Sequence, residues 1–118
     1  MSDIYFDYNA TTPLDEEVFQ SMIPYMKGYY GNPSSVHRVG RKAKAELDDF
    51  RYDVSELWKC KPSEVVFTSG GTESNNLAIF GTARLRKSIG KHLICSSIEH
   101  HAVLHCFEYL AANEGFDV

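Results

Sequence analysis

The segment that decides the fold reads Val65-Val66-Phe67-Thr68-Ser69-Gly70-Gly71-Thr72-Glu73-Ser74-Asn75-Asn76. Its apolar, β-branched start predicts a buried strand over residues 65–68, and the pattern that follows predicts a helix over residues 72–87. Gly70 and Gly71 allow a tight turn of bare backbone between the two. The first helical turn leaves N–H groups without partners, and the helix dipole is positive there, so the segment is suited to hold a phosphate. The Thr72 hydroxyl adds one more donor.

Other phosphate-binding patterns fit this segment less well. A P-loop needs a lysine directly after its second glycine, and none follows here. The G-x-G-x-x-G pattern of dinucleotide-binding folds is also absent, as is an acidic run that could hold Mg²⁺. A nucleoside triphosphate is therefore not expected. The alternative that stays open is an ordinary glycine turn before a helix.

Strands and helices alternate along the rest of the chain, which predicts an α/β fold with a mostly parallel sheet flanked by helices. Two strands and the start of a third are too few to complete such a sheet. By pattern alone, the chain stops inside a domain. The predicted helices span residues 16–27, about 35–59, 72–87 and 102–113, and the predicted strands span 65–68, 92–97 and the start of a third at 116–118.

Local signals predict where the helices begin and end. Asp15 is expected to cap the first helix, and Pro24 to kink or shorten it. Ser34 or Ser35 is expected to cap the long second helix, and Gly115 to end the last one. One face of the long helix is expected to be a buried stripe, made of Val39, Ala43, Leu47, Phe50, Val54 and Leu57.

Two polar segments follow predicted strands, Ser69 to Thr72 and Ile98 to His101. Ligands of open α/β sheets bind at the carboxyl ends of strands, so the phosphate turn and an imidazole are expected to share one rim. An imidazole there can stack on a planar ring, donate a hydrogen bond or carry a proton.

Composition excludes several classes of function. The net charge is −4 with scattered basic residues, so nucleic-acid binding is not expected. No apolar run approaches the length of a membrane span, and no secretion signal is recognisable. Three cysteines without close pairing indicate a reducing, cytoplasmic compartment.

His101 and His105 lack an H-E-x-x-H pattern and a third ligand, so no metal site is expected. Cys95, Cys106 and Trp58 are expected to be core residues.

Four segments together resemble the cysteine desulfurases of the class V aminotransferase group, which depend on pyridoxal phosphate. The resemblance covers Ile4 to Val118 and about the first third of such an enzyme. The selenocysteine lyases share the same segments. The segments are Tyr5-Phe6-Asp7-Tyr8-Asn9-Ala10-Thr11-Thr12-Pro13, Gly31-Asn32-Pro33-Ser34-Ser35, Phe67 to Asn76, and Glu99-His100.

The resemblance implies specific roles for three residues. Gly71 and Thr72 are expected to bind the phosphate of pyridoxal phosphate. His100 is expected to stack on the pyridine ring and assist proton transfers as a catalytic residue. The implied fold is the large domain of a fold-type I pyridoxal-phosphate enzyme, with residues 1–14 as an N-terminal segment and 15–118 as the first part of the domain. Glu73 is expected either to complement the helix dipole or to support the cofactor, and either Asn75 or Asn76 to bond back to the turn.

The resemblance also implies what lies beyond these residues. The family's Schiff-base lysine, catalytic cysteine and substrate-binding arginine match no residue here, so the chain is expected to be an inactive N-terminal fragment. The complete enzyme would convert L-cysteine to L-alanine and a persulfide for iron–sulfur clusters. It would act as a homodimer with scaffold or sulfur-acceptor proteins as partners. Two alternatives stay open: a selenocysteine lyase fragment, or an assembly piece that binds itself or a complementary chain.

Overall fold

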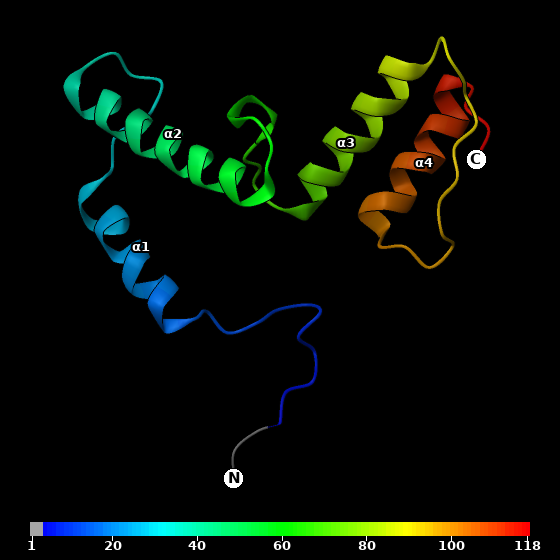
Figure 1. Cartoon of the computed structure of the whole chain (residues 1–118). Coiled ribbons are helices and arrows are strands. Elements are labelled where there is room, and N and C mark those ends of the chain that lie inside the picture. The colour runs from blue at the N-terminus through cyan, green and yellow to red at the C-terminus, as the bar shows by residue number, and fades with distance from the viewer. Residues whose placement is uncertain (1–3) are drawn as a thin grey trace. The chain divides into compact units, whose positions relative to one another are not determined.

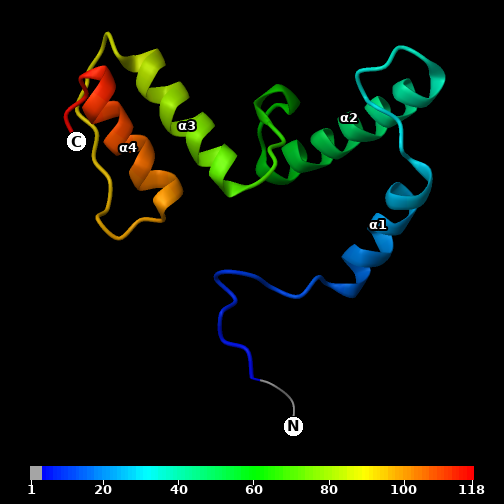
Figure 2. The same ribbon diagram turned by 180° about the vertical axis from the view of Figure 1, so that it is seen from behind.

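The structure is a computed structural model that describes residues 4–118. The chain divides after Val65 into two compact units, and each is described by itself below. Figure 1 follows the elements along the chain, and Figure 2 shows them from behind. The first unit holds α1, α2 and the short 3-10 helix η1, and the second holds α3 and α4.

Helix α1 spans Glu16–Gly28 and begins where its cap was predicted. The Asp15 carboxylate accepts hydrogen bonds from the backbone N–H groups of Glu17, at 2.9 Å, and Val18. The prediction that Pro24 shortens the helix is wrong, because α1 continues through it to Gly28. Proline removes one backbone donor there, and the remaining helical bonds carry the chain past it.

Helix α2 spans Arg38–Trp58, and its cap is His37 rather than Ser34 or Ser35. The His37 Nδ1 atom accepts the Gly40 N–H at 3.3 Å. The two serines instead close a turn on Asn32, whose side-chain and backbone oxygens accept their N–H groups at 2.9 and 3.0 Å. The helix therefore starts about three residues later than predicted. The 3-10 helix η1, Pro62–Glu64, follows it.

The predicted buried stripe of α2 is only partly covered within this unit. Val39, Ala43, Leu47 and Val54 are half-buried, whereas Phe50 and Leu57 are exposed. The prediction that Trp58 is a core residue is also wrong, since its side chain is 75% exposed. The buried residues of α2 are Gly40 and Ser55, so no residue of the predicted stripe is fully buried within this unit.

Gly40 lies where the loop before α2 folds back on the first turn of the helix. A Cβ atom there would lie 2.4 Å from the Ser35 carbonyl oxygen and 2.7 Å from that of Asn32. We expect Gly40→Ala to lower the free energy of unfolding by about 1–3 kcal/mol, measured by urea unfolding. Gly81→Ala is the matched control, because a Cβ in the middle of α3 meets nothing within 4 Å. It should raise stability by about 0.5–1 kcal/mol. Equal effects of the two changes would contradict the close approach at Gly40.

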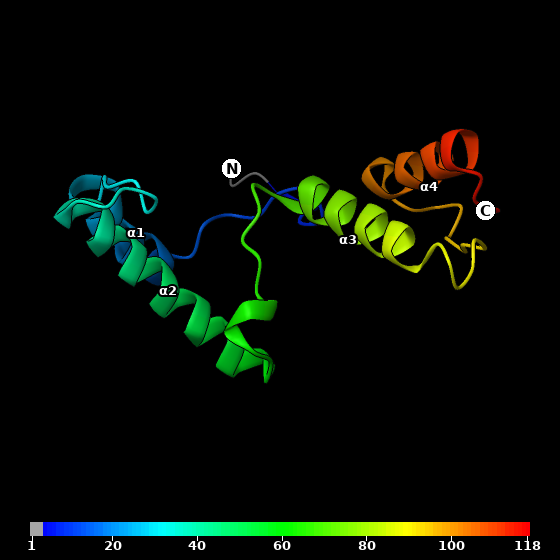
Figure 3. The same cartoon turned by 90° about the horizontal axis from the view of Figure 1, so that it is seen from above.

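The second unit is built on two parallel helices. Helix α3 spans Gly71–Arg86 and α4 spans His101–Glu114, and the two run side by side in the same direction (Figure 3). Phe80 and Tyr109 meet edge to face at 5.6 Å between ring centroids. The Arg84 guanidinium donates three hydrogen bonds to the Glu114 carboxylate, the shortest at 2.7 Å. The buried apolar side chains of the unit are Ala83, Cys106, Leu110 and Phe116.

The cysteine predictions have different outcomes. Cys106 is buried as expected, and its Sγ donates to the Ala102 carbonyl oxygen at 3.1 Å. Burial raises the pKa of the Cys106 thiol, which keeps it protonated and unreactive. Cys95 is only half-buried. Gly115 ends α4 in the left-handed conformation, with φ of +69°, as predicted.

The predicted strands are not formed as strands among residues 4–118. Residues 65–68 and 93–96 belong to no helix or strand, Ser97 lies in a turn, and the pairing present is a single parallel bridge between His92 and Asp117. The Leu93 N–H donates to the Asp117 carbonyl at 2.8 Å, and the Asp117 N–H donates to the Lys91 carbonyl at 2.8 Å. An extended segment becomes a strand only when a neighbour exchanges hydrogen bonds with it along its length. The parallel direction of this one bridge agrees with the predicted parallel sheet.

Candidate functional site

The turn before α3 presents bare backbone, as its two glycines predicted. Gly70 is the N-cap residue in an extended conformation, and among the described residues no side chain caps the helix. A Cβ atom built on Gly70 or Gly71 would meet nothing within 4 Å. The backbone of the turn is therefore open to a ligand from outside the unit.

Five donors at this turn have no partner among residues 4–118. They are the N–H groups of Gly70, Gly71, Thr72 and Glu73 and the Thr72 hydroxyl. The next N–H of the helix, that of Ser74, is already bonded to the Gly70 carbonyl oxygen at 3.1 Å. The free donors are thus confined to the N-cap residue Gly70 and the first three residues of α3, where the helix dipole is positive and favours an anion.

Side-chain hydrogen bonds join the residues before the two glycines to the residues after them. The Ser69 N–H and hydroxyl both donate to Glu73 Oε2, at 2.7 and 2.6 Å. The Thr68 and Ser74 hydroxyls share a second hydrogen bond at 2.6 Å. The bonds from Ser69, first from its hydroxyl and then from its backbone, hold the pKa of Glu73 below its usual value. Glu73 is therefore ionised at neutral pH and bound to Ser69, the residue before Gly70.

Asn76 resolves a choice that the sequence left open. Its side-chain amide donates to the Thr72 carbonyl oxygen at 2.8 Å. Asn76, rather than Asn75, is thus the residue that bonds back to the turn. Because this bond uses the Thr72 carbonyl, it leaves the Thr72 hydroxyl and N–H available.

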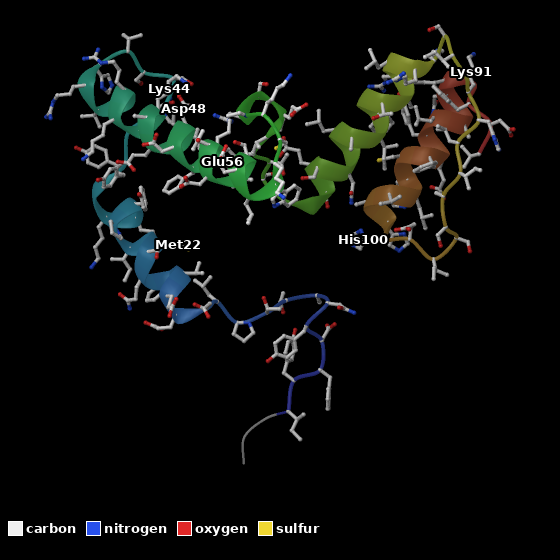
Figure 4. The ribbon with its side chains drawn as sticks, viewed as in Figure 1. Met22, Lys44, Asp48, Glu56, Lys91 and His100 are labelled. Carbon is white, nitrogen blue, oxygen red and sulfur yellow. The ribbon has the colours of Figure 1, made fainter. Side chains whose placement is uncertain are left out.

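His100 is the N-cap residue of α4, and Figure 4 shows it at the start of that helix. Its Nδ1 atom accepts the Ala102 N–H at 3.0 Å. An accepting Nδ1 carries no proton, so the neutral ring carries its proton on Nε2. The helix cap thereby fixes both the tautomer and the orientation of the imidazole.

The first turns of α3 and α4 border one groove of about 310 Å³. Thr72 lines it from α3, and His101 and His105 line it from α4, with their rings stacked at 5.2 Å between centroids. Of the predicted site residues, Thr72 lines this groove, whereas Gly71 and His100 do not. The starts of α3 and α4 lie at the same end of the helix pair (Figure 3), and that end is called the rim below. Both helices also point their positive ends toward this rim.

His101 and His105 line the groove, although the sequence suggested only a metal-binding role for them, which was not expected. The signal was present, because the two histidines are four residues apart and share a helix face with Cys106 and Tyr109. Among residues 4–118 they belong to no group of three side chains that could hold a metal ion.

The helices formed by residues 4–118 include none with the length and apolar character of a membrane span.

The lysines of the second unit lie away from this rim. Lys87 follows directly on the last residue of α3, and Lys91 lies at the end of the helix pair opposite His100 (Figure 4). The 16 residues of α3 separate the two ends by about 24 Å. Neither lysine of this unit is placed to reach a ligand held at the Gly71–Thr72 turn.

Known proteins resemble this chain over nearly its whole length. The model of the family described as aminotransferase class V matches residues 4–118. IscS 1 of Bacillus subtilis, itself provisionally named a cysteine desulfurase, is 48% identical over 118 residues, which are all of this chain and 31% of that protein. The cysteine desulfurase IscS 1 of Archaeoglobus fulgidus is 48% identical over 114 residues, 97% of this chain and 30% of that protein.

A solved structure supports the same relationship. The structure of a NifS-like protein matches with a TM-score of 0.86 at 38% identity, covering 98% of this chain and 31% of that one. The likeness confirms the fold class that the sequence resemblance implied. The chain spans a little under a third of the length of these relatives.

Proposed function

The chain belongs to the class V aminotransferase family, and we propose that it forms the phosphate-binding part of a cysteine desulfurase that uses pyridoxal phosphate. The observation that carries this proposal is the set of donors at the start of α3, Gly71 and Thr72 among them, that have no partner among residues 4–118, at the same end of the helix pair as His100 (Figure 4). The names of the relatives favour a cysteine desulfurase over a selenocysteine lyase.

The residues at the rim fit the phosphate of the cofactor. Open space over Gly70 and Gly71 lets a phosphate oxygen approach the backbone. The Gly71 and Thr72 N–H groups and the Thr72 hydroxyl can each donate to a phosphate oxygen, and the dipole of α3 adds to the attraction. When bound, the cofactor supplies an electron sink for bond cleavage at the substrate.

His100 acts from one nitrogen in this proposal. Its Nδ1 atom is occupied by the cap of α4, so a proton is donated from Nε2 and later returned to the same atom. The exposed ring face is free to stack on a planar heterocycle. Because the cap sets the ring orientation, the direction in which His100 donates its proton depends on the position of α4.

The substrate and partners follow from the same proposal. L-Cysteine would be the substrate, L-alanine and a persulfide the products, and the sulfur would pass to scaffold or acceptor proteins. The active form would be a homodimer, in the cytoplasm. The covalent lysine and the persulfide-forming cysteine would come from residues other than 1–118, so the chain alone would be inactive.

A graft tests the proposed function. Residues 4–118 would replace the matching segment of the Archaeoglobus fulgidus cysteine desulfurase, giving a protein that we name the graft enzyme. We expect the graft enzyme to release alanine and sulfide from L-cysteine in the presence of a thiol. We also expect the 118-residue chain alone to release neither. A graft enzyme that binds pyridoxal phosphate but cleaves only selenocysteine would instead support the lyase alternative.

A further inference from the structure

We propose that Glu73 is a positioning residue that holds the Gly70-Gly71 turn in its anion-binding shape, an inference that rests on the proposed function. Its Oε2 atom accepts both the N–H and the hydroxyl of Ser69, at 2.7 and 2.6 Å. Glu73 lies in the first turn of α3, and Ser69 precedes the N-cap residue Gly70. The carboxylate therefore spans both glycines and ties the helix to the segment before it.

The turn needs such a link because two consecutive glycines have the greatest backbone freedom of any dipeptide. Within the second unit, nothing lies within 4 Å of the Cβ positions of Gly70 and Gly71, so packing does not restrain them. Restraint comes instead from the Glu73–Ser69 bonds and from the Thr68–Ser74 hydroxyl pair. If the donors are already held in position, ligand binding does not have to order them. The entropy lost on binding is then smaller than for a flexible turn.

The geometry distinguishes this role from a simple complement to the helix dipole. A dipole complement needs only a negative charge near the first turn, with no particular partner. Here both bonds converge on one oxygen atom, and one of them uses the Ser69 N–H. The Ser69 N–H is thereby withdrawn from the ligand, which leaves the N–H groups of residues 70–73 and the Thr72 hydroxyl as the donors.

The negative charge of Glu73 and its hydrogen bonds to Ser69 have opposite effects on phosphate affinity. An ionised carboxylate beside a phosphate repels it, so removing the charge alone should tighten phosphate binding. Removing the hydrogen bonds should loosen the turn and weaken binding. Glutamine keeps an acceptor oxygen and the volume of the side chain but carries no charge, whereas alanine lacks all three.

The test compares Glu73→Ala and Glu73→Gln in the graft enzyme. The measured quantities are the dissociation constant of pyridoxal phosphate, from cofactor absorbance, and competition by inorganic phosphate. We expect Glu73→Ala to weaken cofactor binding about tenfold, and Glu73→Gln to stay within about threefold of the unsubstituted protein. Ser69→Ala, which keeps the N–H bond and loses the hydroxyl bond, should give an intermediate loss.

Glu64 provides the matched control. Its carboxylate accepts the Lys61 N–H at 2.7 Å in the first unit, which is the same kind of bond without a phosphate turn. Glu64→Ala should leave cofactor binding unchanged. Unchanged or tighter binding in Glu73→Ala would overturn the positioning role while leaving the proposed function intact. Failure of the unsubstituted graft enzyme to bind the cofactor, where the parent Archaeoglobus enzyme binds it, would overturn both.

Discussion

Replacing His100 with alanine in the graft enzyme should lower turnover of L-cysteine by about 100-fold or more. The substitution removes the imidazole that donates from Nε2, and with it a proton carrier at the rim. It also removes the N-cap of α4, because Nδ1 accepts the Ala102 N–H at 3.0 Å. Loss of the cap should cost about 1 kcal/mol of stability, which thermal unfolding would measure separately.

The His100→Asn variant separates the two roles. Asparagine is among the best N-cap residues, so its side-chain oxygen can accept the Ala102 N–H and restore the stability of α4. It has no ring and cannot carry a proton at neutral pH. We therefore expect near-normal unfolding temperature together with the same loss of turnover as His100→Ala. Turnover close to that of the unsubstituted graft enzyme would show that the imidazole is not needed.

The rim could be predicted from the sequence because its signals are local. The two glycines are followed at once by the helical pattern of residues 72–87. Likewise, the strand-like run of residues 92–97 ends three residues before His100. Turn chemistry and helix starts depend on such short-range information. The start of α2 was placed wrongly because three polar residues, Ser34, Ser35 and His37, compete for the cap. Asn32 accepts hydrogen bonds from the N–H groups of the two serines, and His37 is the residue that caps the helix.

The rest could not be predicted because it depends on distant partners. Residues 65–68 and 92–97 have strand composition, but ladder bonds require a neighbour that local sequence does not supply. Trp58 has the apolar surface of a core residue, yet nothing in the first unit covers it. From the sequence, His101 and His105 were considered only as metal ligands, because their place in a groove depends on α3, which lies opposite them.

Gly71→Pro should weaken pyridoxal phosphate binding to the graft enzyme by about 10- to 100-fold. Gly71 is the first residue of α3, a position where proline fits the helix and its missing N–H breaks no helical bond. The preceding residue, Gly70, is already extended, as a residue before proline prefers. The substitution therefore removes one phosphate donor with little effect on the helix. Equilibrium dialysis against the cofactor would measure the loss.

Gly71→Ala is the control, because it keeps the N–H and adds a Cβ where the unit has open space. It should change cofactor affinity by less than about threefold. Excess cofactor provides the second distinction. It should restore most of the turnover of Gly71→Pro, in which binding is impaired, and none of that of His100→Ala, in which the proton carrier is gone. If Gly71→Pro binds the cofactor normally, the Gly71 N–H is not a phosphate donor and the assignment of this turn is wrong.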